Sequence, residues 1–433
     1  MPSRFANQLE RLRDSDTGKA AGLAAAMIVN NVIALVTSVV FARLLSDYGA
    51  LAALISYLTI LTVAGQAIQV STARDGALGR LGEGEALLRT LERWSRTLVL
   101  FTVGATVISI LLRQPIADLV GVHSHPWAAA AGIPGGCVYL ALCTLRGGLQ
   151  GIGDYRSVGL SLIGEQGVRL IAGGALAGLG MGVGGAYLGS LVAYVAMSVY
   201  CAARLHAQLA PAGRGAWSLG RGVVAATGFG RHVWVSAVPI SALAVVQLLQ
   251  NVDLITAKHR FSESVASAYS VDAVAAKVLI WVAMGASFYL VPETSRRRSA
   301  GEDTRGVLLR TLAIVAVCAV PCLLIFAFGA HPLIELVFGR RRAIATDAVL
   351  PLAAAFTVLA GTYLAVQYLL ALRRSRFLLA LAVLAAFEPL ALAHSSRSPA
   401  SFATLVLAVQ VVGALISYLI ALRRPPQLIV LGS

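Results

Sequence analysis

The chain has 433 residues, of which 58% are hydrophobic and 13% charged, with a mean hydropathy of +0.79. An average soluble domain is roughly 45–50% apolar, so the composition excludes a water-soluble fold. The formal net charge of +15 would suit a nucleic-acid-binding protein, and the positions of the charges therefore have to decide between nucleic acid and membrane.

Apolar blocks of about 18 to 25 residues alternate with short Arg-rich connections, and a helix of about 20 apolar residues crosses a bilayer. The sequence lacks the alternating pattern of a membrane β-barrel. We therefore expect an all-α integral membrane protein of about twelve transmembrane helices. The blocks lie at 19–42, 49–71, 97–113, 127–149, 158–180, 183–204, 233–256, 265–291, 307–329, 349–371, 375–393 and 402–422.

If the N-terminus is cytoplasmic, Lys and Arg in the cytoplasmic segments outnumber those on the opposite side about three to one. This bias predicts cytoplasmic N- and C-termini and contact with anionic membrane lipids, and it argues against nucleic acid as a partner. The first 18 residues are polar and charged, so no cleavable signal is expected. The 32 Arg against 3 Lys favour a GC-rich bacterial genome, and we expect a multi-pass protein of the bacterial inner membrane.

The chain contains an internal repeat. The segment Pro115–Gly121 echoes Pro332–Gly339 with an offset of 217, and the same offset relates Gln150 to Gln367. Six helices per copy is an even number, so both copies enter the membrane from the same side and are parallel repeats related by an axis along the membrane normal. The predicted parts are an N-terminal six-helix bundle over 1–205, a cytoplasmic linker over 206–231 and a C-terminal six-helix bundle over 232–433.

Amide side chains recur at helical spacing inside three of the predicted helices, where polar groups are costly and mark a transport pathway by default. One interpretation is a wet interior that these amides line. The other is interhelical hydrogen bonding, worth ~0.6 kcal/mol per contact on average. The amides are Asn30 and Asn31 in the first helix, Gln66 and Gln69 in the second, and Gln247, Gln250 and Asn251 in the seventh.

Charged residues also fall inside predicted helices, where a lone cation costs at least ~2.5–3.5 kcal/mol. Arg169 lies near the middle of the fifth helix, with Glu165 one turn earlier, and Lys277 lies in the eighth. These cations either pair internally, Glu165 with Arg169 and Asp253 or Asp272 with Lys277, or form a cationic site for an anionic substrate.

Two further arginines, Arg43 and Arg74, sit at helix ends that face opposite membrane surfaces, and act there as interface anchors or as gate residues. The five cysteines fall inside predicted helices without a CxxC pair, which favours plain packing over metal binding or disulfides. The pair His123 and His125 lacks convincing partner ligands. We therefore expect no metal site and no cofactor.

Four motifs together resemble the multidrug/oligosaccharidyl-lipid/polysaccharide exporter superfamily, and within it the chain is most similar to the polysaccharide-repeat-unit flippases. The motifs are Ala42–Gly49, Leu149–Gly151, Gly182–Ala186 and Leu336–Gly339. The resemblance implies two six-helix bundles around a V-shaped cavity that is lined mainly by the first, second, seventh and eighth helices. It also implies a substrate whose sugar-diphosphate head crosses the cavity while its polyprenyl tail stays in lipid.

The expected function is translocation of a polyprenyl-diphosphate-linked saccharide to the outer leaflet for cell-surface polysaccharide export, with H⁺ or Na⁺ as a possible coupling ion. The first alternative is a cation-coupled multidrug antiporter of the same superfamily, but the first helix has no acid in its span. The second is a membrane glycosyltransferase or polymerase. Because the sequence offers no phosphate loop, catalytic triad or large outer loop, we do not expect an enzyme.

Overall fold

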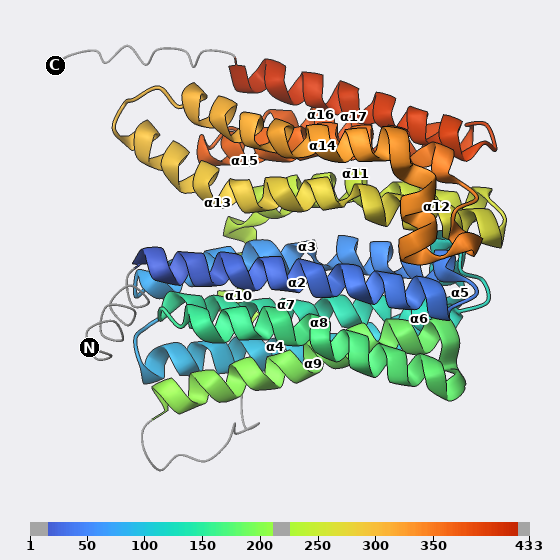
Figure 1. The fold of residues 1–433 in the computed structure, drawn as a ribbon. Coiled ribbons are helices and arrows are strands. Elements are labelled where there is room, and N and C mark those ends of the chain that lie inside the picture. Colours follow the sequence, from blue (N-terminus) through green and yellow to red (C-terminus); the bar gives the residue numbers. More distant parts are fainter. Residues whose placement is uncertain (1–15, 211–225, 423–433) are drawn as a thin grey trace, which may run out of the picture. The chain divides into compact units, whose positions relative to one another are not determined.

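The computed structural model describes residues 16–210 and 226–422, and its regular elements are all helices (Figure 1). The long ones are α2 (Asp16–Leu44), α3 (Tyr48–Ala77), α4 (Glu85–Leu111), α7 (Gly132–Gly151), α8 (Tyr155–Leu176), α9 (Gly182–Leu209), α11 (Ala237–Arg260), α12 (Glu263–Ala276), α13 (Val278–Ser299), α14 (Arg305–Phe338), α15 (Val349–Ala371), α16 (Phe377–Ala393) and α17 (Pro399–Leu422). The short ones are α5 (Arg113–Val120), α6 (Pro126–Ala130), η1 (Ala177–Met181), α10 (Ala226–Val235), η3 (Arg340–Arg342) and η4 (Thr346–Ala348).

Ten segments of the described chain are long and apolar enough to cross a membrane. One of them, Tyr155–Leu209, contains both α8 and α9, and α16 is a further apolar helix of 17 residues. The chain turns between α8 and α9 at Gly180 and Gly182, whose φ angles of 95° and 51° suit glycine. The prediction of an all-α, multi-pass membrane protein with about twelve crossings is therefore confirmed.

The structure divides into two compact units. Unit 1 comprises Met1–Val274 and Leu333–Ile344, and unit 2 comprises Ala275–Pro332 and Ala345–Ser433. Unit 1 thus holds α2 to α11, most of α12 and the tip of α14. The predicted domains, 1–205 and 232–433, are sequence repeats, whereas the two units are defined by compactness, so the predicted division stays a prediction. Part of the predicted linker, 206–231, lies outside the described residues.

Unit 1 is built on close helix contacts. Its α3 packs against α7 and α11, while α8 packs against α2 and α9 (Figure 1). A Cβ at Gly189 would lie 2.4 Å from the Gly173 Cα, and one at Gly147 would lie 2.7 Å from the Thr72 Cβ. Small residues at such crossings let membrane helices approach each other closely, so the glycines secure packing here.

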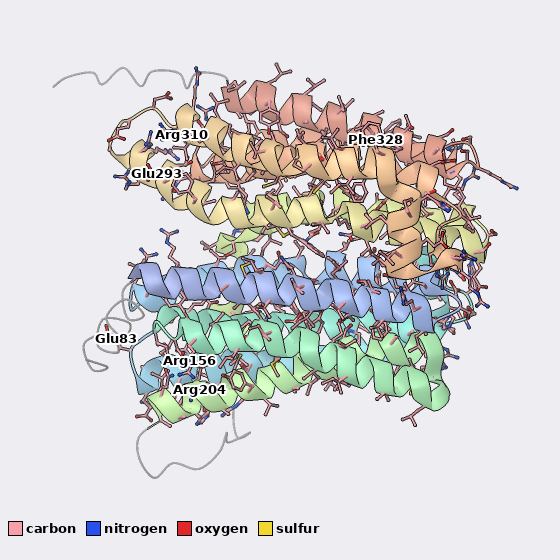
Figure 2. All side chains as sticks on the ribbon, in the orientation of Figure 1. Glu83, Arg156, Arg204, Glu293, Arg310 and Phe328 are labelled. Carbon is pink, nitrogen blue, oxygen red and sulfur yellow. The ribbon has the colours of Figure 1, made fainter. Side chains whose placement is uncertain are left out.

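In unit 2, α15 lies in the centre and packs against α13 and α17. A buried polar pair, in which Gln410 Nε2 donates to Glu388 Oε1 at 3.3 Å, joins α16 to α17. The long α14 is kinked at Gly329, where φ and ψ are −135° and 17°. Its Phe328 side chain is 88% exposed (Figure 2), as expected for a lipid-facing helix surface.

Three predicted boundaries are wrong. The eighth predicted helix, 265–291, is two helices, because the chain breaks at Lys277 between α12 and α13. The ninth predicted helix, 307–329, continues past its kink to Phe338. The connection between the third and fourth predicted helices contains most of α5, and the start of the fourth predicted helix, 127–149, is the separate short helix α6. Hydropathy locates the apolar segments, but it does not predict helix breaks, kinks or short helices within or between them.

We call the end of unit 1 at which α2 ends the distal end, and the end at which α2 begins the proximal end. Figure 2 shows Glu83, Arg156 and Arg204 at the proximal end of the unit 1 helices. There Asp154 caps α8 by accepting from the Ser157 N–H at 3.0 Å, and Gln208 donates to the same carboxylate at 2.6 Å. These bonds tie the proximal ends of α8 and α9 together.

The short helix α10 docks on the proximal part of α3 and α4. His232 Nε2 lies 2.8 Å from Ser71 Oγ, and His232 Nδ1 lies 3.4 Å from an Asp75 carboxylate oxygen. The Trp94 ring packs against both His232, at 4.9 Å, and Phe229, at 5.5 Å. Burial lowers the pKa of His232, and the Asp75 charge opposes this shift only in part.

We expect the docking of α10 to weaken in acid. Because the docked His232 has a lowered pKa, docking favours the neutral ring, so the stabilisation is complete above the usual pKa of about 6.5 and is lost as the pH falls below it. Hydrogen–deuterium exchange of 226–235, corrected for the intrinsic pH dependence, should rise between pH 7.5 and pH 5. His232→Gln should flatten this pH response, and an unchanged response in that variant would refute the role of the imidazole.

Candidate functional site

The most deeply buried cation of unit 1 is Arg146, on α7, whose side chain has no exposed surface. Its Nη2 lies 2.9 Å from Glu165 Oε2 on α8, an ion pair without good hydrogen-bond alignment. Its Nε and Nη2 atoms donate to the hydroxyl and the carbonyl of Ser161, both at 2.8 Å. A buried charge that is paired and hydrogen-bonded in this way holds helices in register.

This arrangement corrects the predicted pair. Glu165 was expected to pair with Arg169 one turn along α8, but the structure pairs it with Arg146. The sequence interpretation missed Arg146, because it lies three residues before the end of the predicted helix 127–149 and was counted with the arginines at the membrane surface. The approach of Ser161 and Glu165, which makes Arg146 a buried ion-pair partner, depends on how α7 and α8 pack.

Arg169 consequently forms no ion pair with a described residue. Its side chain is half-buried, and its buried Nε atom has no hydrogen-bond partner among the described residues. Tyr48, Tyr187 and Tyr194 lie within electrostatic range of its charge. Tyr187 is fully buried, and its hydroxyl also has no hydrogen-bond partner in the described part of the chain. The guanidinium therefore sits among polar groups with donors still to be satisfied.

Lys277 lies in unit 2, at the break between α12 and α13, and is 9% exposed. Its Nζ atom lies 5.4 Å from the centre of the Phe356 ring on α15, within the range of a cation–π interaction. Of its expected acidic partners in unit 1, Asp253 accepts a 3.3 Å hydrogen bond from the Tyr269 hydroxyl. Asp253 and Asp272 are both fully buried.

Some of the predicted amides bond to each other. Asn30 Nδ2 donates to Asn31 Oδ1 at 3.2 Å on α2. On α11, Asn251 Nδ2 donates to the Gln247 carbonyl at 2.9 Å and to Gln247 Oε1 at 3.2 Å. These bonds are formed within one helix, whereas the packing interpretation expects hydrogen bonds between helices.

Three other predicted amides make no side-chain hydrogen bond to a described residue. Gln66 and Gln69 lie on one half-buried face of α3, and no hydrogen bond joins their side chains to another described residue. Gln250 on α11 is 7% exposed and likewise makes no side-chain hydrogen bond within the described residues. Because α3 and α11 pack against each other, these free amides belong to neighbouring helices. Buried polar groups need partners, so water or substrate is expected beside them.

Replacing one free amide separates the two interpretations. We expect Gln66→Leu to leave the free energy of unfolding within about 0.5 kcal/mol, because no internal hydrogen bond is lost. Asn251→Leu, the matched control, removes two bonds from its side chain and should cost about 0.6 and at most about 1.7 kcal/mol. Unfolding in mixed detergent micelles measures both values. A loss for Gln66→Leu as large as that for Asn251→Leu would support packing instead.

The two end arginines differ in their surroundings. Arg43, at the end of α2, donates from Nη2 to the Leu336 carbonyl at 2.6 Å and from Nε to the Val337 carbonyl at 2.9 Å. Arg74, in the last turn of α3, is exposed and makes no hydrogen bond to a described residue. Arg43 is thus tied to the tip of α14, whereas Arg74 has the surroundings of a headgroup anchor.

The structure therefore brings together only part of the predicted set. Gln66, Gln69, Gln250 and the Asn251 pair lie on the packed helices α3 and α11, while Arg169 and Glu165 lie on α8. Asn30 and Asn31 lie on α2, which packs against α8. Lys277 belongs to the other unit. The arrangement in unit 1 offers a free guanidinium and free amides at membrane depth, a combination that can bind phosphate and sugar hydroxyls.

Comparisons with solved structures find the same fold at low sequence identity. The chain is similar to a lipid II flippase, MurJ, in an inward closed conformation, with a TM-score of 0.72, 13% identity and coverage of 93% of this chain and 88% of that chain. It is also similar to a multidrug resistance MATE family transporter in an inward-facing conformation, with a TM-score of 0.67, 13% identity and coverage of 93% and 98%.

A third similar structure is a eukaryotic MATE transporter, with a TM-score of 0.60, 15% identity and coverage of 94% of this chain and 96% of that chain. No protein-family model and no curated protein matches the sequence. The structural similarity establishes the fold. At sequence identities of 13–15% it does not identify the substrate or the coupling ion. The chain has the all-helical, multi-pass fold of two six-helix bundles that MurJ and the MATE transporters of the multidrug/oligosaccharidyl-lipid/polysaccharide exporter superfamily share.

Proposed function

We propose that the protein is a flippase that moves a polyprenyl-diphosphate-linked saccharide from the cytoplasmic to the outer leaflet by alternating access, for cell-surface polysaccharide export. The likeness to a lipid II flippase over 93% of the chain supports this proposal. So does the presence of Arg169 on a membrane helix of unit 1, because a diphosphate head carries negative charge through a medium of low dielectric constant.

The observation that carries the proposal is the state of Arg169. A half-buried guanidinium on a membrane helix, with its Nε unpartnered among the described residues, carries an uncompensated cost. A substrate phosphate offsets that cost, because a guanidinium can donate two parallel hydrogen bonds to it. Arg146, which is also inside the membrane, has its own carboxylate in Glu165 and is assigned a structural role.

The amides complete the proposed pathway. Gln66, Gln69 and Gln250 have donors and acceptors left over, and an amide offers both to a sugar hydroxyl. They replace part of the hydration that the saccharide loses on leaving water. Lys277 is proposed to add a second positive charge for the diphosphate. The polyprenyl chain stays in hydrocarbon throughout, as its apolar character requires.

The proposed setting is the bacterial inner membrane with cytoplasmic N- and C-termini, which follows from the Arg-rich connections. In this orientation the proximal end of unit 1 faces the cytoplasm and the distal end faces outward. The substrate and the membrane lipids are the partners, and H⁺ or Na⁺ is a possible coupling ion. No cofactor has a role in this cycle, and the proposed activity is transport rather than enzymatic catalysis.

A cation-coupled drug antiporter is the second candidate, because the fold is shared with MATE transporters. Such a transporter needs a membrane-depth carboxylate that is free to bind a cation. In α2 the one acid is Asp16, at the first residue of the helix, and Glu165 is occupied by Arg146. The acid-poor α2 and the pairing of Glu165 favour the anionic substrate over the cationic one. The buried Asp253 and Asp272 of unit 1 are the carboxylates that an antiporter would use.

Ligand-induced stabilisation tests the substrate class directly. A ligand that binds the folded state raises its stability by about 2.7 kcal/mol at a hundredfold excess over the dissociation constant. We expect a polyprenyl-diphosphate-linked disaccharide to raise the melting temperature of the purified protein, and Arg169→Ala to reduce this rise. Ethidium, a cationic drug, should have little effect. A rise with ethidium alone would overturn the proposal in favour of the antiporter.

A further inference from the structure

The internal repeat reappears in the structure as two helix tips at the distal end of unit 1. The first tip is α5, which ends at Gly121, and the second is the last part of α14, which ends at Gly339. The φ angles of these glycines are 77° and 94°, a backbone region that suits glycine. Helix C-termini leave carbonyl groups without intrahelical partners, so each tip presents free acceptors.

Each tip accepts hydrogen bonds from the end of the first helix of the other repeat. Arg43, at the end of α2, donates to the Leu336 carbonyl in the α14 tip at 2.6 Å. His259, at the end of α11, lies with Nε2 3.1 Å from the Leu119 carbonyl in the α5 tip. The repeat offset of 217 carries Leu119 onto Leu336 and brings Arg43 to within one residue of His259. The Arg43–Leu336 and His259–Leu119 contacts therefore occupy equivalent positions in the two repeats.

A third contact lies close to the two-fold axis that would relate the two repeats. The Gly49 N–H, in the first turn of α3, donates to Ser267 Oγ on α12 at 2.9 Å. These positions differ by 218, one more than the repeat offset, so Gly49 meets the neighbour of its counterpart in the other repeat, as residues near a two-fold axis do. A Cβ on Gly49 would lie 3.1 Å from the Ser267 nitrogen, so the two helix ends are in direct contact.

Two additional cations reinforce this end. Arg342, 6% exposed and just beyond the α14 tip, donates to the carbonyls of Ala42, Leu45 and Ser46 at 3.1, 2.6 and 3.1 Å. These carbonyls lie at and beyond the C-terminus of α2, where positive charge is stabilising. Lys258 bonds both oxygens of Asp47 at 2.8 and 2.7 Å.

We propose that the contacts of Arg43, His259, Arg342 and the Gly49–Ser267 pair form a two-fold symmetric gate, the distal clamp, which is closed in this structure and breaks when the substrate pathway opens at the distal end. This inference rests on the proposed alternating-access function. Arg43 and His259 are exposed, so water replaces their carbonyl partners readily on opening. A reversible gate needs such contacts, in contrast to the buried pair of Arg146.

The test measures opening without any substrate. Ser267→Cys places a thiol at a fully buried position of the clamp, and its reaction with a water-soluble maleimide in nanodiscs is followed by peptide mass spectrometry. We expect Arg43→Ala to raise the labelling rate about tenfold and His259→Ala to raise it about threefold, because each removes part of the clamp. Together they should multiply, as independent contributions to one opening equilibrium do.

The matched control is Arg340→Ala. Arg340 lies two residues from Arg342 but pairs with Glu335 within the same tip, so its loss should leave labelling unchanged. Wild-type labelling rates in folded Arg43→Ala and His259→Ala variants would overturn the gate, as would an equal rise in the control. If Arg342→Ala folds, its labelling rate should also rise. The labelling experiment needs no ligand. It therefore tests the distal clamp even if the lipid-linked disaccharide does not raise the melting temperature of the protein.

Discussion

Arg169→Ala is expected to lower the rate of lipid-linked saccharide translocation about 10- to 100-fold. Hydrogen bonds to charged groups contribute about 1.5–3 kcal/mol each, and this range corresponds to that loss when one substrate contact disappears. Stability should change little, because the Arg169 Nε has no partner to lose among the described residues. The measurement is the initial rate of translocation in proteoliposomes, with the melting temperature recorded for each variant.

The matched variant Arg169→Lys keeps the charge but cannot form the bidentate contact, so an intermediate rate is expected. Lys277→Ala tests the second proposed cation, and the double variant with Arg169→Ala should be slower than either alone. If the rate in Arg169→Ala equals that of the wild type while the protein is folded, the guanidinium does not bind the substrate head and the cationic-site proposal fails.

Arg146→Met is expected to cost about 3–5 kcal/mol of unfolding free energy, because it leaves the Glu165 carboxylate buried without its ion-pair partner. The double variant Arg146→Met/Glu165→Met removes both charges. Replacing a buried pair with apolar residues of similar volume is often neutral, so the double variant should recover most of the loss. Unfolding in mixed micelles measures the complete double-mutant cycle.

The comparison of the single and double variants identifies the role of the pair. A large loss that the second substitution rescues indicates a structural ion pair. If the double variant stays as unstable as Arg146→Met, the hydrogen bonds to Ser161 rather than the ion pair are the main contribution of Arg146. A single variant as stable as the wild type would contradict the buried pairing altogether.

Hydrophobicity and length made the helices predictable from the sequence, because a bilayer leaves few alternatives to a long apolar helix. The break at Lys277 and the kink at Gly329 were not predictable in this way, since the apolar sequence continues on both sides of each residue. The repeat was visible in Pro115–Gly121 and Pro332–Gly339, but its meaning as two matched helix tips required the contacts of Arg43 and His259.

The candidate site was predictable by residue type and only partly by partner. Arg169 and the amide stripe of Gln66 and Gln69 could be identified because polar groups are rare inside apolar helices. The partner of Glu165 could not, because helical spacing offered Arg169 while the crossing of α7 and α8 brings Arg146 into contact. A tertiary contact of this kind overrides a local i,i+4 pairing, which is worth only about 0.2–0.5 kcal/mol.

Translocation by the purified protein is the most direct test of its proposed role. Proteoliposomes that contain a fluorescent polyprenyl-diphosphate disaccharide should show transfer of the sugar head between leaflets that is faster than in protein-free vesicles and depends on Arg169. If the wild-type protein leaves that transfer at the protein-free rate, yet exports ethidium when a proton or sodium gradient is imposed, the account of a lipid-linked saccharide flippase is contradicted.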